Sequence, residues 1–184
     1  GGNITVSRST EALEGARVEV SGGTLNLTSS DDGINAANGD LTANTSGEDT
    51  SIYWIKLTGG NITVNAEGDG IDSNGNAYID GAEVIVYGPT AGGNGALDVA
   101  DGTGVFEVNS GMLLATSGTS DMAIGTSGTL TPVVFTLTSA VAAGDTLTIA
   151  DASGNAVTSL ITQKSTAWVL YAHSDIMKDA SYSL

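Results

Sequence analysis

The sequence predicts an all-β solenoid of the parallel β-helix type, and three observations lead to this fold class. A motif that opens with a glycine pair returns at intervals of about 22 residues. Within each copy, apolar residues alternate with threonine or asparagine, which is the period of a β-strand. Glycine, asparagine and serine interrupt this pattern every few residues, as turns require. A leucine-rich repeat has a similar period, but its consensus of leucine and asparagine is missing here.

The repeat is clearest in three hexapeptides, at residues 1–6, 22–27 and 59–64, and two looser copies follow at 81–86 and 110–115. The first two copies begin 21 residues apart and the third and fourth 22 apart, whereas the other intervals are 37 and 29 residues. The longer intervals indicate insertions near residues 43–58 and 88–95. Each unit is expected to hold a second strand, at 17–20, 40–42 and 77–79. The predicted interior consists of Ile4, Val6, Leu25, Leu27, Ile62, Val64, Val84 and Val86.

The repeat fades after about residue 129. Further strands are expected at 133–137, 146–149, 157–161, 168–171 and 182–184, without the glycine pair. An exposed end of a solenoid invites pairing with another strand edge and has to be covered. We therefore expect one domain, with parallel β-helix coils over residues 1–128 and a C-terminal β cap over residues 129–184.

Composition excludes several classes of partner and site. Twenty-one acidic residues against five basic ones give a net charge of −16, which argues against nucleic acid and anionic membrane as partners. Cysteine is absent, so disulfides and thiolate metal sites are excluded, and His173 is the single imidazole. No apolar run approaches the ~20 residues of a membrane span. We expect a soluble chain that is a monomer or part of a larger protein.

Acidic residues recur at fixed positions of the repeat. Counted from the first glycine of each unit, positions +10 and +13 carry polar residues, and position +12 carries an apolar one. If the coils stack in register, these positions form two columns of side chains. The Glu14 column contains Glu14, Asn35, Asp72 and Asp98, and the Glu11 column contains Glu11, Asp32 and Asp69, with Asp31 close to it.

Stacked carboxylates are unfavourable unless something is bound between them. Two carboxylates about 5 Å apart repel by roughly 3 kcal/mol at an effective dielectric constant near 20. Because the available ligands are all oxygen atoms, the sequence predicts Ca²⁺, with more than one ion bridging adjacent coils. The predicted ligands are Glu11, Glu14, Asp31, Asp32, Asn35, Asp69, Asp72 and Asp98. The alternative is that these residues recur only because each coil needs a turn, with the charges in solvent.

The segments 9–15, 30–36, 67–75, 86–90 and 95–98 resemble, in this order, a bacterial family of carbohydrate-binding domain-containing proteins. Two of these segments carry the triplet Asp-Gly-Ile, and Ala12 stands where a glycine is more usual. The resemblance implies a right-handed parallel β-helix similar to that of pectate lyases, with calcium at the acidic turns. It also implies secretion and binding of plant cell-wall polysaccharides, including acidic pectic ones.

We therefore expect a noncatalytic, calcium-dependent module that binds cellulose, acidic pectic glycans such as polygalacturonate, or both. Calcium can hold an acidic glycan on an acidic protein, whereas a neutral glucan needs aromatic platforms. The candidate platforms are Tyr53, Trp54 and Tyr87, whose alternative role is packing between strands, and Trp168 is expected to pack in the cap.

Two other functions remain open from the sequence. A calcium-stabilised adhesin or spacer module would use the ions only to make the coils rigid. A pectate-lyase-like enzyme would need a basic residue beside the calcium, and the coils offer Arg8, Arg17 and Lys56, none of which lies in an acidic turn. His173 lies in the expected cap, which argues against a histidine-dependent triad.

Overall fold

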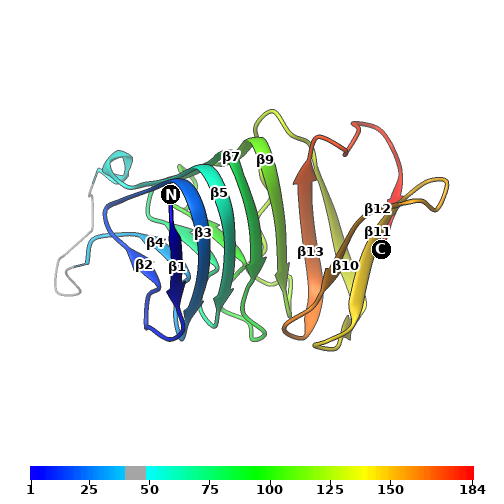
Figure 1. Ribbon diagram of the computed structural model, residues 1–184, viewed down its shortest axis with the longest axis horizontal. Coiled ribbons are helices and arrows are strands. Elements are labelled where there is room, and N and C mark those ends of the chain that lie inside the picture. The colour runs from blue at the N-terminus through cyan, green and yellow to red at the C-terminus, as the bar shows by residue number, and fades with distance from the viewer. Residues whose placement is uncertain (40–48) are drawn as a thin grey trace.

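The computed structural model describes residues 1–39 and 49–184, and in this part of the chain the regular structure is almost entirely β (Figure 1). A short 3-10 helix, η1, covers Thr50–Ile52. The strands are β1 Asn3–Val6, β2 Leu13–Glu14, β3 Arg17–Ser29, β4 Ile34–Ala36, β5 Trp54–Ala66, β6 Ile71–Ser73, β7 Asn76–Tyr87, β8 Leu97–Val99, β9 Phe106–Ser117, β10 Pro132–Val141, β11 Thr146–Asp151, β12 Ala156–Ile161, β13 Thr166–His173 and β14 Tyr182–Ser183.

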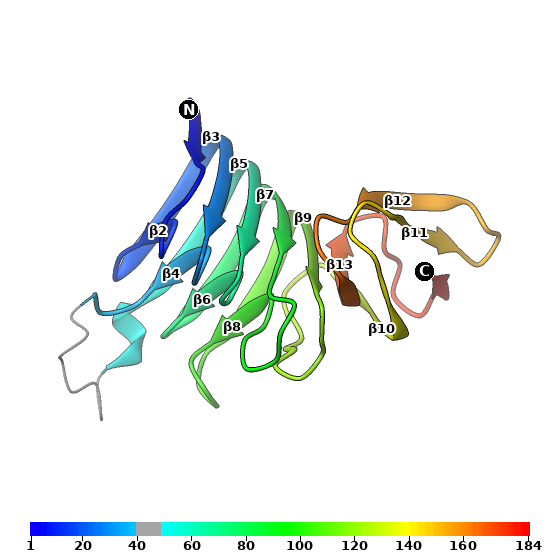
Figure 2. The ribbon, with the colours of Figure 1, turned by 90° about the horizontal axis from the view of Figure 1, so that it is seen from below.

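The first nine strands form two parallel sheets that grow together along the chain. One sheet contains β1, β3, β5, β7 and β9 in this order, and the other contains β2, β4, β6 and β8 (Figure 2). Each turn of the chain therefore adds one strand to each sheet. The predicted all-β class and the parallel pairing are confirmed. We refer to β1 through β9 as the parallel region.

The second and third glycine pairs lie inside long strands, whereas the sequence suggested that each pair separates two shorter ones. β3 runs through Gly23 and β5 runs through Gly60, and the pairing between these two strands shifts register at this point. Their φ angles are +102° and +98°, a region that side chains disfavour. A Cβ on Gly60 would also lie 2.7 Å from the carbonyl oxygen of Gly23 on the neighbouring strand. The glycines allow the stacked strands to change direction together while they stay in contact.

The core lies between the two parallel sheets, and most of the predicted interior is found there. Leu25, Leu27, Ile62, Val64, Val84 and Val86 are all buried in one cluster. Ile4 is 50% exposed and Val6 is only partly buried, so the prediction is wrong for Ile4. The physical reason is that β1 has a strand neighbour on one side only, β3, among the described residues.

The second strand of the second unit also differs from its predicted position. In the structure, the counterpart of Arg17–Val20 is the beginning of β5, where Trp54 pairs with Arg17 and Leu57 pairs with Val20. The predicted strand at 40–42 lies outside the described residues, as do residues 43–48 of the insertion predicted near 43–58. β5 begins at Trp54, within the range predicted for the insertion, so counting from the glycine pair placed the strand too early.

The C-terminal region, β10 through β14, departs from parallel pairing. β13 joins the large sheet antiparallel to β9, and β10 pairs antiparallel with β13. β11, β12 and β14 form a separate antiparallel sheet. All five strands expected between residues 133 and 184 are present. Trp168 is 3% exposed, so it is packed as expected, but it lies in the core cluster of the parallel region rather than in a core of the cap.

A second apolar cluster connects the two regions. It brings Tyr87 and Leu114 of the parallel region together with Leu147, Ile149 and Val169 of the C-terminal region. The strands that supply these side chains follow one another along the molecule in Figure 1. Among the described residues, no helix has the length and apolar character needed to cross a membrane.

Candidate functional site

The predicted columns of acidic residues are in register in the sheet of short strands. Glu14 on β2 pairs with Asn35 on β4, Asn35 pairs with Asp72 on β6, and Asp72 pairs with Asp98 on β8. The turns before these strands are also hydrogen-bonded to one another. The backbone amide of Asp69 donates to the carboxylate of Asp32 at 2.7 Å. The Glu14 and Glu11 columns are thus real alignments of the structure.

Glycines bring the acidic turns close together. A Cβ on Gly68 would lie 2.5 Å from carboxylate oxygens of both Asp31 and Asp32. A Cβ on Gly33 or Gly70 would collide with a valine side chain and a backbone carbonyl of the neighbouring turn. The repeated Asp-Gly-Ile triplet therefore has a steric cause, since a side chain at the glycine would push the acidic turns apart.

The turns gather the carboxylates into two overlapping clusters. Glu11, Asp31 and Asp32 form one and Asp32, Asp69 and Asp72 form the other, and in each cluster one oxygen of every residue lies within 4.8 Å of the others. Asp32 belongs to both. Its carboxylate accepts hydrogen bonds from the amide of Asp69 and, at 3.3 Å, from the side chain of Asn35. Both clusters could hold metal ions.

Burial and repulsion between the carboxylates raise the pKa values of these groups. Burial, followed by the charges of neighbouring carboxylates, raises the pKa of Glu11 from 4.5 to about 7. The same causes raise the pKa of Asp72 from 3.8 to about 7. Burial also raises the pKa of Asp69 to about 6, although a hydrogen bond from the amide of Gly95 opposes the shift. The protein thus holds several carboxylates that bind protons more readily than usual near neutral pH.

The donor atoms fit calcium. The clusters supply only oxygen ligands, which Ca²⁺ prefers, and they contain neither sulfur nor imidazole nitrogen. Glu11 Oε2 and Asn35 Oδ1 are buried and have no hydrogen-bond partner among the described residues. Buried acceptors of this kind are costly, and a bound cation would satisfy them. The residues that would hold the ions are Glu11, Asp31, Asp32, Asn35, Asp69 and Asp72.

Two of the predicted ligands stand apart from the clusters. Glu14 is exposed at the start of its column, and Asp98 stands at the other end. Neither belongs to the two clusters that could hold a metal ion, although Asp98 is close enough to contribute to the raised pKa of Asp72. The structure thus concentrates the predicted site on the turns at β2, β4 and β6, the first three of the four stacked turns.

The structure separates the three aromatic candidates for a sugar platform. Tyr53 is 2% exposed and belongs to the core cluster, and Tyr87 is 5% exposed and donates its hydroxyl to the carbonyl of Ile161. Because a sugar stacks on an accessible ring face, the expectation is wrong for these two tyrosines. Trp54 is partly exposed and remains a candidate.

Trp54 lies in a groove of about 400 Å³ on the outer side of β5, β7 and β9. Sequence reasoning did not find the other residues of this groove, which include Tyr78, Asp80, Glu107 and Asn109. The available signal was the alternation of residue types in β7 and β9. Every second residue is apolar and points into the core, so the residues between them point outward. It could be used only once β5 was known to begin at Trp54.

A comparison with protein families agrees with this picture, whereas comparisons with curated proteins and with solved structures found no match. The family model described as carbohydrate-binding domain-containing protein matches residues 1–103, which is more than half of the chain and includes both acidic clusters. The chain therefore belongs to the family of carbohydrate-binding domain-containing proteins.

Proposed function

We propose that the protein is a noncatalytic, calcium-dependent carbohydrate-binding module for plant cell-wall polysaccharide. The observation that carries this proposal is the alignment of carboxylates from successive turns into two clusters, in a chain that belongs to a carbohydrate-binding family. Glu11, Asp31, Asp32, Asn35, Asp69 and Asp72 are the proposed calcium ligands. Bound calcium would hold the turns together and would supply positive charge for a uronate glycan such as polygalacturonate.

We also propose that the parallel region is a right-handed parallel β-helix and that residues 129–184 cap it within the same domain. The in-register pairing of β1 through β9 supports the first statement. The antiparallel pairing of β13 with β9 supports the second, because it covers the edge of the last parallel strand. An extracellular or cell-surface location is part of the same proposal, since cell-wall polysaccharides lie outside the cell.

The surroundings of the basic residues favour binding over lyase chemistry. Arg17 donates through Nε to the carbonyl of Ile52 at 3.1 Å, and Lys56 lies over the ring of Trp54. β-Elimination from a uronate needs a basic group next to the metal-bound substrate. The two basic side chains lie on β3 and β5, in the other sheet than the strands of the acidic columns, which supports a noncatalytic role.

The test is retention of the protein by polysaccharides with calcium and with a chelator. Affinity electrophoresis in polygalacturonate gels and pull-down on insoluble cellulose are to be compared for the unmodified protein, Asp72→Asn and the control Asp151→Asn. We expect retention by polygalacturonate that needs calcium and is lost in Asp72→Asn only. Lack of retention on both polysaccharides would favour the adhesin or spacer function instead. Release of an unsaturated product would show a lyase.

A further inference from the structure

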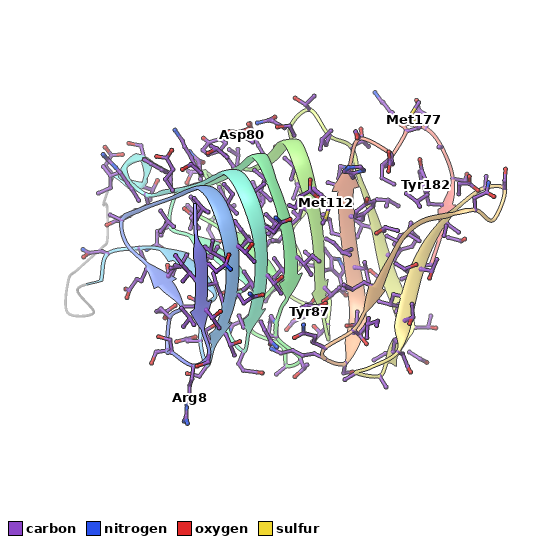
Figure 3. All side chains as sticks on the ribbon, viewed as in Figure 1. Arg8, Asp80, Tyr87, Met112, Met177 and Tyr182 are labelled. Carbon is purple, nitrogen blue, oxygen red and sulfur yellow. The ribbon has the colours of Figure 1, made fainter. Side chains whose placement is uncertain are left out.

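The groove beside Trp54 has a chemical character different from that of the acidic clusters. It is lined by side chains from three adjacent parallel strands, with Trp54 on β5, Tyr78 on β7 and Glu107 on β9. The acidic clusters lie on β6 and in the turns before β2, β4 and β6, and they share no residue with the groove. Figure 3 shows Asp80, which lines the groove, near the top of the view and Tyr87, the last residue of β7, near the bottom. The molecule thus presents two separate polar surfaces.

Aromatic and amphipathic side chains occupy one part of the groove. The ammonium group of Lys56 lies 4.7 Å from the ring centroid of Trp54 and 5.9 Å from that of Tyr78. In the pairing of β5 with β7, Lys56 lies opposite Tyr78 and Trp54 lies opposite Asn76, so the two rings are diagonal neighbours. Lys56 is exposed, and cation–π contacts at exposed sites are weak, so a ligand can displace it from the rings.

Hydrogen-bonding groups occupy the other part of the groove. Asn109 donates to Asp80 at 3.0 Å and to Glu107 at 3.3 Å, which holds the two carboxylates in place. The carboxylates accept hydrogen bonds from hydroxyl groups, and they repel anions. With two carboxylates and one ammonium group in the groove, in a chain of net charge −16, a uronate is a poor ligand here. A neutral, hydroxyl-rich ligand is the one that fits.

The spacing of the strands suits a flat sugar chain. Neighbouring strands lie ~4.8 Å apart, which is close to the length of one pyranose unit, and the groove crosses three strands. A sugar chain whose hydroxyls are equatorial has apolar C–H faces and polar edges. Its faces can pack on Trp54 and Tyr78 while its edges reach Asp80 and Glu107.

We infer that this groove binds a neutral polysaccharide with equatorial hydroxyls, such as cellulose, independently of the calcium clusters. The inference rests on the proposed function and deepens it, because it assigns neutral and acidic glycans to different surfaces of the same domain. Trp54 and Tyr78 supply the stacking surface, and Asp80, Glu107 and Asn109 supply the hydrogen bonds.

The test uses cellohexaose as a soluble probe and insoluble cellulose as a solid one. Trp54→Ala and Tyr78→Ala should each weaken cellohexaose binding by about tenfold or more, as truncation of a buried aromatic contact does. Trp54→Phe, which keeps a flat ring, should lose less. Retention by polygalacturonate with calcium should stay unchanged in all three variants. Asp72→Asn should show the opposite pattern, with cellulose binding kept and polygalacturonate binding lost.

Tryptophan fluorescence gives a readout of position as well as affinity. The chain has two tryptophans, and Trp168 is 3% exposed in the core, so a ligand in the groove should change the emission of Trp54. Cellohexaose should shift the emission of the unmodified protein and leave that of Trp54→Phe unchanged. Tyr182→Ala serves as an aromatic control in the C-terminal region and should bind as the unmodified protein does. Thermal melting of each variant confirms that it is folded.

The possible failures are distinguishable. If the unmodified protein binds cellulose and folded Trp54→Ala binds it equally well, the inference is wrong and the proposed function stands. If the protein binds polygalacturonate but neither cellulose nor cellohexaose, the inference is again wrong and the proposed function again stands. If it binds no polysaccharide at all, both are wrong. A dimer that Trp54→Ala disrupts, without any cellohexaose binding, would assign the groove to a second copy of the chain and overturn the inference.

Discussion

Acidic residues behave in opposite ways in the parallel region and in the C-terminal region. Burial and like charges raise the pKa of Asp72 to about 7, whereas hydrogen bonds from Asn155 lower the pKa of Asp151 in the turn between β11 and β12. Parallel strands in register place Asp72 beside Asp98 of one neighbouring strand and beside Asn35 of the other. In the antiparallel hairpin, the carboxylate is satisfied by its own turn. Among the described residues, carboxylates thus form clusters that could hold metal ions where the parallel turns repeat.

The largest effect is expected from a change that tests whether the two regions unfold together. Trp168 of β13 is buried in the core cluster of the parallel region, so Trp168→Ala should lower the free energy of unfolding by about 3–5 kcal/mol. For a chain of this size, the melting temperature should fall by roughly 6–20 °C. Calorimetry should show one transition before and after the change. Two separate transitions would mean that the C-terminal region is a domain of its own.

Calcium should have the next largest effect, and it should act on the parallel region. A ligand at 100 times its dissociation constant stabilises the folded state by about 2.7 kcal/mol, which corresponds to roughly 5–10 °C here. We expect the melting temperature to fall by this amount when calcium is removed with a chelator, and to recover when calcium is added back. An unchanged melting temperature after exhaustive chelation would contradict the calcium site.

Asp72→Asn should remove much of this calcium effect. The change takes a negative charge from the second cluster and leaves a side chain of nearly the same size. In the chelated protein at pH 8 it should be stabilising, because it also removes repulsion. Melting curves with and without calcium check both statements. Asp151→Asn is the matched control, since its carboxylate lies in the hairpin turn, and it should respond to calcium as the unmodified protein does.

Without calcium, stability should fall as the pH rises. A carboxyl group whose pKa is higher in the folded state binds more protons when folded, so it favours folding at low pH and loses this effect as the pH passes the folded pKa. The pKa of Asp72 rises from 3.8 to about 7, and that of Glu11 from 4.5 to about 7. We therefore expect the chelated protein to lose stability between about pH 4 and pH 7. Urea unfolding at a series of pH values measures this slope, and a slope of the opposite sign would refute the assignment.

The smallest effect is expected from a change at Glu67, because this residue of an acidic turn is already paired with a lysine of the chain. Lys164 of the C-terminal region lies 3.0 Å from Glu67 and also donates to the carbonyl of Ala66. Because Glu67 is 59% exposed, Glu67→Gln should cost about 1 kcal/mol or less. The response to calcium should be unchanged in this variant, as judged by melting curves. A large loss of that response would make Glu67 a ligand.

Sequence reasoning placed the acidic columns correctly, but two of its three aromatic candidates for a sugar platform, Tyr53 and Tyr87, are buried in the structure. The spacing from glycine pair to acidic turn is conserved within the chain from one unit to the next, so Glu14, Asn35 and Asp72 could be aligned by counting. Trp54 could not be aligned in this way, because the sequence does not fix where the insertion between the glycine pairs at 22 and 59 begins and ends. Without the position of β5, Tyr78 was not recognisable as the neighbour of Lys56.

Burial was the other quantity that counting could not supply. Tyr53 and Trp54 are adjacent in the sequence, yet Tyr53 belongs to the core and Trp54 lines the groove. Tyr87 is covered by residues from the C-terminal region, including Ile161. The carbonyl oxygen of Ile161 accepts a hydrogen bond from the Tyr87 hydroxyl. Which ring remains accessible depends on strands that lie far away in the sequence.

The amino-acid sequence alone determined the β class, the repeat and the order of the carboxylates from one stacked turn to the next. These features depend on local periodicity and on the regular step between parallel strands, and both can be read along the chain. Only the tertiary structure decided that Lys164 meets Glu67, that Tyr53 is buried, and that Trp54, Tyr78 and Glu107 share a groove. These contacts join residues across insertions and between regions, where the distance in space is set by packing and has no fixed relation to the distance along the chain.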